Sequence, residues 1–248
     1  MSPRLLLARA LWGSAEVAVT LGLLVLLLVV HQLWWTNREA RAGAERQVQA
    51  LEEEWGGAPG NREAGLSPED QEPRSPDQDG PEPGPDRSGG RSAPPRWDQA
   101  YAVLRIPRIG VTAPVAQGIS KSGVLNRGYV GHYPGTAQPG GAGNFALAGH
   151  RNTHGEPFRY INRLRPGDVV RVDTREARFT YRVEKTLPQT TAADGSVIGA
   201  VPRSSVRPQY GFDERGYYIT LTTCTPEYTS KYRLVVWGRL QSAEPRTS

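Results

Sequence analysis

Hydrophobic and polar residues divide the chain into three stretches with different patterns. The first holds a nearly unbroken apolar run, VAVTLGLLVLLLVVHQL, at residues 17–33. Trp12 on one side and Trp34 and Trp35 on the other extend it to about the 20 residues that cross a bilayer. Tryptophans in these places are typical of the aromatic belts at the two membrane interfaces. We therefore expect a transmembrane signal-anchor helix over residues 11–35.

A cleaved signal peptide is the alternative interpretation of this run. Its apolar core would cover only about 7–15 residues and would be followed by small residues. Here the core is longer, and the HQLWWTNREAR that follows its densest part is a poor cleavage site. An uncleaved anchor is therefore favoured. Arginines flank the run on both sides, so the positive-inside rule does not orient it.

The second stretch changes from helix formers to residues that disfavour a folded core. Residues 36–55 are rich in Ala, Arg and Glu, which predicts a helix that continues past the membrane. Residues 56–96 consist mainly of Pro, Gly, Ser, Arg and acidic residues, with almost no large apolar side chain. Such a segment cannot bury enough apolar surface to offset its chain entropy. We expect a disordered linker, a stalk that would hold a folded domain away from the bilayer.

The third stretch, residues 97–241, shows short apolar or alternating runs between glycines and prolines. RFTYRVEKT, for example, alternates apolar and polar positions as a half-buried strand does. The runs lie at residues 101–107, 111–116, 144–150, 168–174, 177–186, 216–224 and 232–240. Only FRYINRL at 158–164 is typical of a helix, and RPGD and DTRE mark turns. The pattern predicts a mainly β domain, a compact barrel or sandwich, with residues 242–248 as a tail.

The formal net charge of +5 is unevenly distributed along the chain. The linker is acidic, whereas the C-terminal domain is distinctly basic. A basic domain suits an anionic partner such as lipid headgroups, a cell-wall polymer or nucleic acid, and the sign of the charge does not choose among them.

Cys224 is the only cysteine in the chain, so it forms no disulfide within it. It ends the predicted strand GYYITLTTC, just before Pro226 stops strand pairing. One interpretation is packing, because a buried cysteine behaves as a small hydrophobe. The other is chemistry: Arg233 begins the next strand, and an antiparallel hairpin would bring its guanidinium back beside the thiol. A nearby cation favours a thiolate and stabilises a developing oxyanion.

A cysteine nucleophile needs a proton donor for its leaving group, which is usually histidine. His31 lies in the membrane run, His132 in a loop, and His154 in a polar loop typical of a surface. His150 ends the apolar strand NFALAGH, so two strand ends carry a histidine and Cys224. Spacing alone leaves open whether they cooperate. One cysteine and scattered histidines make no zinc-ligand set, and GTAQPGGAG lacks the Lys of a phosphate-binding loop.

Three motifs together resemble the sortase family of cysteine transpeptidases, which attach proteins to Gram-positive cell walls. They are LAGHR with His150 and Arg151, TLTTC ending in Cys224, and SKYRLVVWG with Arg233. GHYPGTAQPGGAGNFALAGHR and TLTTCTP further resemble the class E branch of high-GC actinobacteria, which agrees with the Arg-, Ala- and Gly-rich composition. The resemblance implies the eight-stranded sortase-type β-barrel with short helices, preceded by one transmembrane helix and a disordered stalk.

The resemblance also implies roles for individual residues. Cys224 would attack the carbonyl between Thr and Gly of a Leu-Ala/Pro-X-Thr-Gly sorting signal and form a thioester. His150 would protonate the departing amine and later deprotonate the incoming one, and Arg233 would hold the substrate and the oxyanion. Tyr133 is a candidate for reading the signal and Thr223 a candidate donor beside the nucleophile, with loop packing and strand propensity as their alternatives. No metal or organic cofactor is implied.

The implied partners are secreted proteins that carry the sorting signal and an amine of a lipid-linked peptidoglycan precursor, with no nucleic acid. Because these partners lie outside the cell, residues 1–10 would be cytoplasmic and the catalytic domain extracellular, in a single-pass protein of the cell membrane. In that oxidising setting a solitary thiol is better explained by a chemical role than by packing. Two alternatives stay open: a cysteine hydrolase with water as acceptor, and a non-enzymatic wall-binding module.

Overall fold

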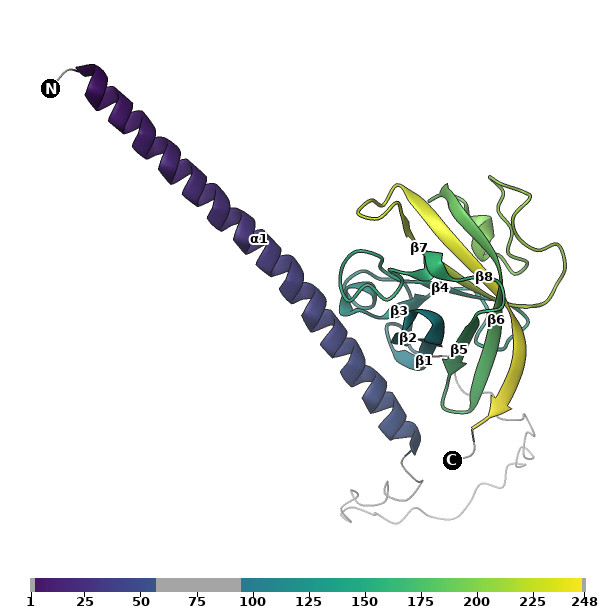
Figure 1. The fold of residues 1–248 in the computed structure, drawn as a ribbon. Coiled ribbons are helices and arrows are strands. Elements are labelled where there is room, and N and C mark those ends of the chain that lie inside the picture. Colours follow the sequence, from purple (N-terminus) through teal and green to yellow (C-terminus); the bar gives the residue numbers. More distant parts are fainter. Residues whose placement is uncertain (1–2, 57–94, 247–248) are drawn as a thin grey trace, which may run out of the picture.

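The computed structural model describes residues 3–56 and 95–246, which form one long helix and a β-barrel (Figure 1). The elements are α1 (Pro3–Gly56), β1 (Ala100–Ile106), η1 (Pro107–Ile109), β2 (Val111–Gln117), η2 (Leu125–Arg127), β3 (Val130–His132), β4 (Gly143–Ala148), η3 (Ile161–Arg163), β5 (Val169–Asp173), β6 (Ala177–Thr191), η4 (Gly195–Ile198), β7 (Tyr217–Thr225) and β8 (Tyr232–Pro245). The η elements are single turns of 3-10 helix.

The strands close into a barrel in the order β1-β2-β3-β4-β7-β8-β6-β5. The pairs β2–β3 and β4–β7 are parallel, and the other neighbours are antiparallel. Closure leaves no unpaired sheet edge. The predicted eight-stranded barrel is confirmed, and each of the seven apolar runs read from the sequence lies on a strand.

Alternation along the strands separates the core from the outer face. Leu147 of β4 and Ile219 and Leu221 of β7 are buried in the main core cluster. Since successive side chains of a strand point to opposite faces, Thr222 and Cys224 lie on the outer face of β7. The core thus fixes the face on which the thiol stands.

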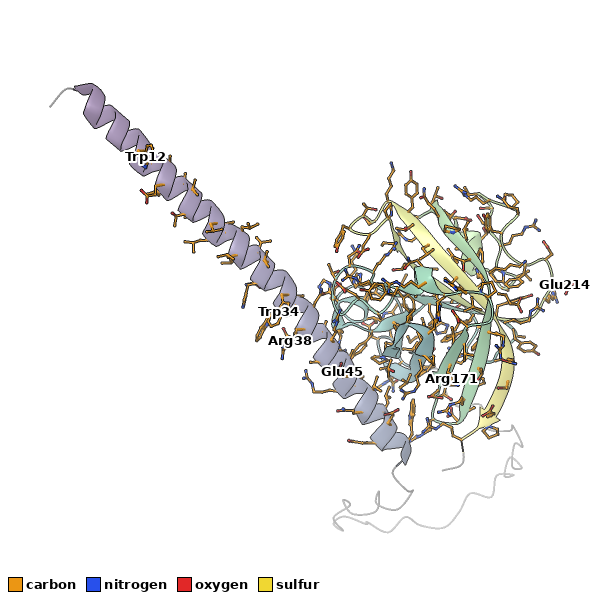
Figure 2. All side chains as sticks on the ribbon, viewed as in Figure 1. Trp12, Trp34, Arg38, Glu45, Arg171 and Glu214 are labelled. Atoms are coloured by element: carbon orange, nitrogen blue, oxygen red, sulfur yellow. The ribbon has the colours of Figure 1, made fainter. Side chains whose placement is uncertain are left out.

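The first part of α1 is apolar and lies away from the barrel (Figure 2). Every large apolar side chain from Val17 to Val30 is about half exposed or more. Exposed apolar surface on this scale is unfavourable in water and marks contact with a membrane or a partner. By length and composition, α1 is the one candidate membrane span in the described part of the chain, consistent with the predicted anchor.

The second part of α1 packs against the barrel beside β1 and β2 (Figure 1). Ala40, Ala44, Val48 and Leu51 recur every three or four residues and are buried. This spacing places them on one face of the helix. The helix expected over residues 36–55 is present, and its apolar stripe belongs to the core of the folded domain.

The structure differs from the sequence pattern in three places. β3 lies where a loop was expected, because three residues are too few to show a strand period. Of the expected helix at 158–164, only η3 forms. β8 continues to Pro245, so residues 242–245 of the expected tail pair with β6. The expected linker, 56–96, lies almost entirely outside the described residues.

Candidate active site

The parallel pair β4–β7 brings His150 level with Cys224. Its register pairs Ala148 with Thr222 at the end of β4. The Gly149 amide donates to the Thr222 carbonyl oxygen at 3.2 Å, which continues the ladder past the strand end. Two residues beyond the Ala148–Thr222 pair, the chain reaches His150 on one side and Cys224 on the other.

The antiparallel pair β7–β8 brings Arg233 to the other side of Cys224. The two residues are direct register partners, so their side chains leave the sheet on the same face. Arg233 Nη1 donates to the carbonyl oxygens of Ser230 (2.8 Å) and Tyr232 (3.0 Å), which holds the guanidinium at the end of the hairpin. The Cys224 thiol is free and half-buried. The expected hairpin is present, and strand pairing gathers His150, Cys224 and Arg233 at one end of the barrel.

His150 is held mainly as a neutral imidazole. Its Nε2 lies 2.9 Å from Asn126 Oδ1, an acceptor that fixes the ring proton on Nε2. The ring stacks on that of His154, with centroids 5.3 Å apart and an interplanar angle of 29°. Burial lowers the pKa of His150 to about 4, and the charges of His154 and Lys121 act in the same direction. The imidazolium that would protonate a leaving amine is therefore a minor form at neutral pH.

The positions of His154 and Asn126 did not follow from the sequence. His154, expected at the surface, is half-buried, and its Nδ1 is buried without a hydrogen-bond partner among the described residues. Its backbone has a φ of 52°, in the left-handed region. Both residues lie in irregular segments, where no hydrophobic period reveals which side chains will meet.

His132 is the second histidine whose position differs from the expectation. It lies on β3 instead of in a loop and is fully buried. Its Nδ1 is 2.8 Å from Tyr101 Oη, its Nε2 is 3.1 Å from the Ala137 carbonyl oxygen, and its ring meets Phe145 edge-on. Burial lowers the pKa of His132 to about 4. Within residues 3–56 and 95–246, no group of three or more His, Cys, Asp or Glu is arranged to hold a metal ion.

Arg151 makes a second connection between the ends of β4 and β7. Its Nη1 donates to the Cys224 carbonyl oxygen at 3.2 Å and to Thr225 Oγ1 at 2.9 Å. The residue is only 9% exposed. A buried guanidinium with these two acceptors fixes the backbone next to the thiol. Arg151 stands in the LAGHR motif, but its sequence position gave no sign of this contact.

Tyr133 and Thr223 lie on different sides of β7. Tyr133 Oη is 3.1 Å from Thr222 Oγ1, and Thr222 shares the face of Cys224. This position suits a residue that reads a bound peptide. Thr223 points to the opposite face, and its hydroxyl donates to the Gly149 carbonyl oxygen at 2.8 Å. The Thr223 hydroxyl therefore supports the end of β4. Of Thr223, only the backbone remains a candidate donor for the substrate.

Comparisons with known proteins agree with this geometry. A profile described as the Sortase domain matches residues 104–241. Sortase SrtE1 of Streptomyces coelicolor is 45% identical over 237 residues, which cover 94% of this chain. Sortase SrtE2 of the same organism is 31% identical over 249 residues, which cover 98% of this chain. The chain spans 57% of the length of SrtE1 and 86% of the length of SrtE2.

Solved structures show the same fold. The crystal structure of sortase E1 from Streptomyces coelicolor with a tripeptide in the active site is 52% identical, with a TM-score of 0.57. It covers 60% of this chain, and 92% of its own chain is matched. Sortase E from Streptomyces avermitilis is 39% identical, with a TM-score of 0.53, over 60% of this chain and 93% of that one. This chain therefore belongs to the sortase family. Within the family it resembles the class E sortases.

Proposed function

We propose that this chain is a membrane-anchored cysteine transpeptidase that cleaves a sorting signal between Thr and Gly. It transfers the part of the substrate that precedes the cleaved bond to an amine of the cell wall. The observation that supports this most strongly is the strand register, which sets His150 and Arg233 on the two sides of Cys224. A nucleophile, a proton carrier and a fixed cation are the groups that acyl transfer requires.

The reaction runs in two halves. The Cys224 thiolate attacks the Thr carbonyl carbon, and the Arg233 guanidinium stabilises the negative charge that develops on the carbonyl oxygen. The imidazolium of His150 gives its proton to the Gly nitrogen as the C–N bond breaks, which leaves a thioester on Cys224. An incoming amine then attacks the thioester, neutral His150 takes its proton, and the thiolate is released.

The substrate class is a peptide of the Leu-Ala-X-Thr-Gly type, with Leu-Pro-X-Thr-Gly as the related signal. The sortase E1 structure from Streptomyces coelicolor holds a tripeptide in its active site, and its 52% identity supports a peptide ligand here. Tyr133, bonded to Thr222 beside Cys224, contacts the signal residue that distinguishes Ala from Pro. Secreted proteins that carry such a signal are the donors.

The acceptor is an amine of a lipid-linked peptidoglycan precursor. Such precursors lie at the outer surface of the cell membrane, so the N-terminus is cytoplasmic and the barrel extracellular. The long apolar part of α1 provides the single membrane crossing that this arrangement requires.

A peptide assay tests the proposal. The full chain in detergent or nanodiscs is incubated with a fluorescent Leu-Ala-X-Thr-Gly peptide, with and without an amine acceptor. We expect cleavage between Thr and Gly and a ligated product that replaces hydrolysis as the amine concentration rises. If hydrolysis alone persists at saturating amine, the chain is a cysteine hydrolase and the transpeptidase proposal fails.

The same assay separates an enzyme from a wall-binding module. Cys224→Ala should abolish cleavage, and a thiol alkylator should label the folded wild-type chain and inactivate it. A Cys224→Ala variant with full activity would mean that the thiol is structural.

A further inference from the structure

The contacts of α1 with the barrel follow a fixed order along the helix. Asn37 comes first: its Nδ2 donates to Glu156 Oε1 at 2.9 Å, and its Oδ1 accepts from the Gly155 amide at 3.3 Å. Arg41 then pairs with Glu156 at 3.1 Å. Glu156 and Gly155 belong to the loop that follows His150, so the first contacts of the helix are with the catalytic end of the barrel.

The last contacts of α1 are with the opposite end of the barrel. Glu54 pairs with Arg175, in the turn between β5 and β6, at 3.3 Å. The Trp55 ring lies under the Arg246 guanidinium, just after β8 ends. β8 runs from the catalytic end at Arg233 to this far end, and its arrow finishes beside the C-terminal end of α1 (Figure 1). The helix therefore crosses the barrel from the catalytic end to the far end over about 27 Å, at 1.5 Å per residue.

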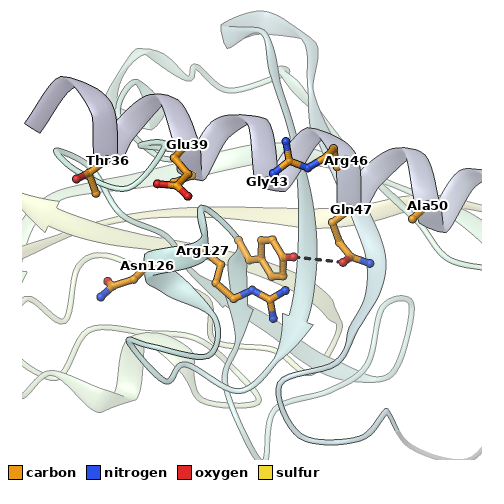
Figure 3. Close-up of a pocket in the computed structure, with 10 residues that line it drawn as sticks. Thr36, Glu39, Gly43, Arg46, Gln47, Ala50, Asn126 and Arg127 are labelled. Carbon is orange, nitrogen blue, oxygen red and sulfur yellow. Dashed lines mark hydrogen bonds between the residues drawn. The ribbon is translucent and has the colours of Figure 1, made fainter. Parts of the chain in front are cut away.

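The packing between α1 and the barrel is close. Ala44 is buried in one cluster with Ala116, Val124 and Tyr129. Tyr129 Oη donates to Gln47 Oε1 at 3.2 Å, at the edge of a cavity of about 580 Å³ that Asn126 and Arg127 also line (Figure 3). At Gly128 a Cβ would stand 2.8 Å from the Ala40 carbonyl oxygen. Only glycine permits this approach, so the helix is seated on the barrel before the linker begins.

The membrane boundary falls beside the first of these contacts. The exposed apolar side chains end at Val30, and Trp34 and Trp35 follow, each more than half exposed. Tryptophan pairs of this kind lie at the membrane–water interface. Asn37 is two residues, or about 3 Å, further along the helix axis. The loop after His150 is therefore at the level of the lipid headgroups.

We propose that the docked helix holds the catalytic end of the barrel against the outer surface of the membrane, so that Cys224 faces phospholipid headgroups. This orientation rests on one part of the proposed function, namely that α1 crosses the bilayer and the barrel lies outside the cell. The docked helix replaces the expected stalk as the element that sets the distance between the barrel and the bilayer. A lipid-linked acceptor then reaches the thioester without movement of the whole domain.

One guanidinium at this junction, that of Arg38, is open to an anionic headgroup. A cavity of about 510 Å³ lies between helix and barrel there, lined by Trp34, Arg38, Arg41 and Arg159, with Glu45 and Glu156. Trp34, Arg38 and Glu45 stand on the part of α1 that runs beside the barrel, and in this view their side chains lie on the side of the helix away from it (Figure 2). Glu156 is already paired with Arg41 and Arg159, and Arg159 is also paired with Glu227. Arg38, whose guanidinium lies over the Trp34 ring, is in no ion pair with a described carboxylate. Guanidinium groups bind phosphate oxygens in a bidentate manner.

The solitary cysteine makes the orientation measurable at the catalytic residue itself. The full chain is labelled at Cys224 with a fluorophore and placed in nanodiscs of phosphatidylcholine and phosphatidylglycerol that carry a headgroup nitroxide quencher. The reference is Cys224→Ala with Ala243→Cys, an exposed position near the far end of β8. We expect severalfold stronger quenching at Cys224 than at position 243. Equal quenching, or stronger quenching at position 243, overturns the proposal.

Two helix variants test whether docking sets this orientation. Ala44→Arg places a charge in the buried interface, and Ala50→Arg makes the same change at an exposed position. Ala44→Arg should lower the quenching of the Cys224 label to the level of position 243, whereas Ala50→Arg should leave it unchanged. Unchanged quenching in Ala44→Arg contradicts the proposal.

The unlabelled variants keep this test separate from the proposed function. Ala44→Arg should cleave the soluble peptide at the wild-type rate, which shows that the barrel is folded. If wild type does not cleave the peptide, the proposed function fails, while the difference in quenching still decides the orientation. If the full chain does not remain in the nanodisc, the membrane-facing orientation fails regardless of activity.

Discussion

The surroundings of the His150 ring set its protonation state and thereby the rate of the proposed reaction. Burial and the neighbouring His154 favour the neutral ring, so its pKa lies at about 4. At pH 7 only about one molecule in a thousand then carries the imidazolium. Only that form can protonate the leaving amine. Changes around this ring should therefore alter the rate of acylation measurably.

Replacing His154 tests this dependence. Asn tolerates the left-handed backbone at this position and removes both a ring that buries His150 and a charge that repels its proton. In His154→Asn we expect the pKa of His150 to rise from about 4 toward 6.5. NMR titration of the His150 ring protons measures it, and kcat/KM at pH 7 should rise severalfold. An unchanged titration would mean that His154 does not influence His150.

Asn126 is a positioning residue that acts through one hydrogen bond, to the His150 ring. Asn126→Ala removes the acceptor of His150 Nε2–H, and a hydrogen bond of this kind contributes about 0.5–1.5 kcal/mol. We expect kcat to fall about 2- to 10-fold with little change in KM. Asn126→Asp keeps an acceptor and adds a charge that favours imidazolium, so it should restore the rate and raise the pKa of His150. Equal losses in both variants would indicate a merely structural role.

His132 should make the fold sensitive to acid. Its pKa is about 4 in the folded protein because of burial, against about 6.5 when unfolded. The contribution of neutral His132 to the free energy of unfolding is complete above pH 6.5. It is lost as the pH falls toward 4, because the histidine of the unfolded chain takes up a proton first. The loss is on the order of 3 kcal/mol. Urea unfolding at pH 7.5 and 4.5 should show a large decrease in the free energy of unfolding for wild type and a smaller decrease for His132→Gln. Equal drops would assign the acid sensitivity to other groups.

At the scale of elements, the proposed active site is a consequence of strand pairing. β7 lies between β4 and β8, so one parallel and one antiparallel register deliver His150 and Arg233 to Cys224. The Arg151 side chain locks the free ends of β4 and β7 together.

Arg151 should therefore stabilise the end of β7. Arg151→Gln leaves the half-buried Cys224 carbonyl oxygen without its guanidinium donor, a loss of about 1–3 kcal/mol. We expect faster amide hydrogen exchange for residues 222–226 and a lower midpoint in thermal unfolding. Arg165→Gln, at an exposed position, serves as the control and should change neither measurement. Unchanged exchange in Arg151→Gln would show that strand pairing alone holds the site.

Strand alternation explains how far the sequence could predict this site. Long periodic runs such as 177–186 and 216–224 revealed their strands. The strand ends made Cys224 and His150 candidates, and the family resemblance supplied their roles. β3 has only three residues, so no period was visible and His132 was misplaced in a loop. Asn126 and His154 approach His150 from irregular segments, and their contacts depend on tertiary packing. The helix over residues 36–55 was predicted from its helix-forming residues, but nothing in the sequence identified its buried stripe or the surface that the stripe covers.

At the scale of the whole molecule, helix and barrel form one unit. The helix that would cross the membrane continues without a break onto the barrel, and its first contacts are with the loop beside His150. The proposed anchor and the proposed active site are thus linked by packed side chains. This arrangement suits an enzyme whose acceptor is carried by the membrane.

The central claim is that Cys224 carries the acyl group between two amines, and intact mass spectrometry tests it most directly. The full chain is incubated briefly with a Leu-Ala-X-Thr-Gly peptide without acceptor and quenched in acid. We predict a mass increase equal to the peptide through Thr, located on Cys224, absent in Cys224→Ala and discharged into a ligated product when an amine is added. Cleavage of the peptide with no adduct on Cys224, or an adduct that an amine does not discharge, would contradict the account.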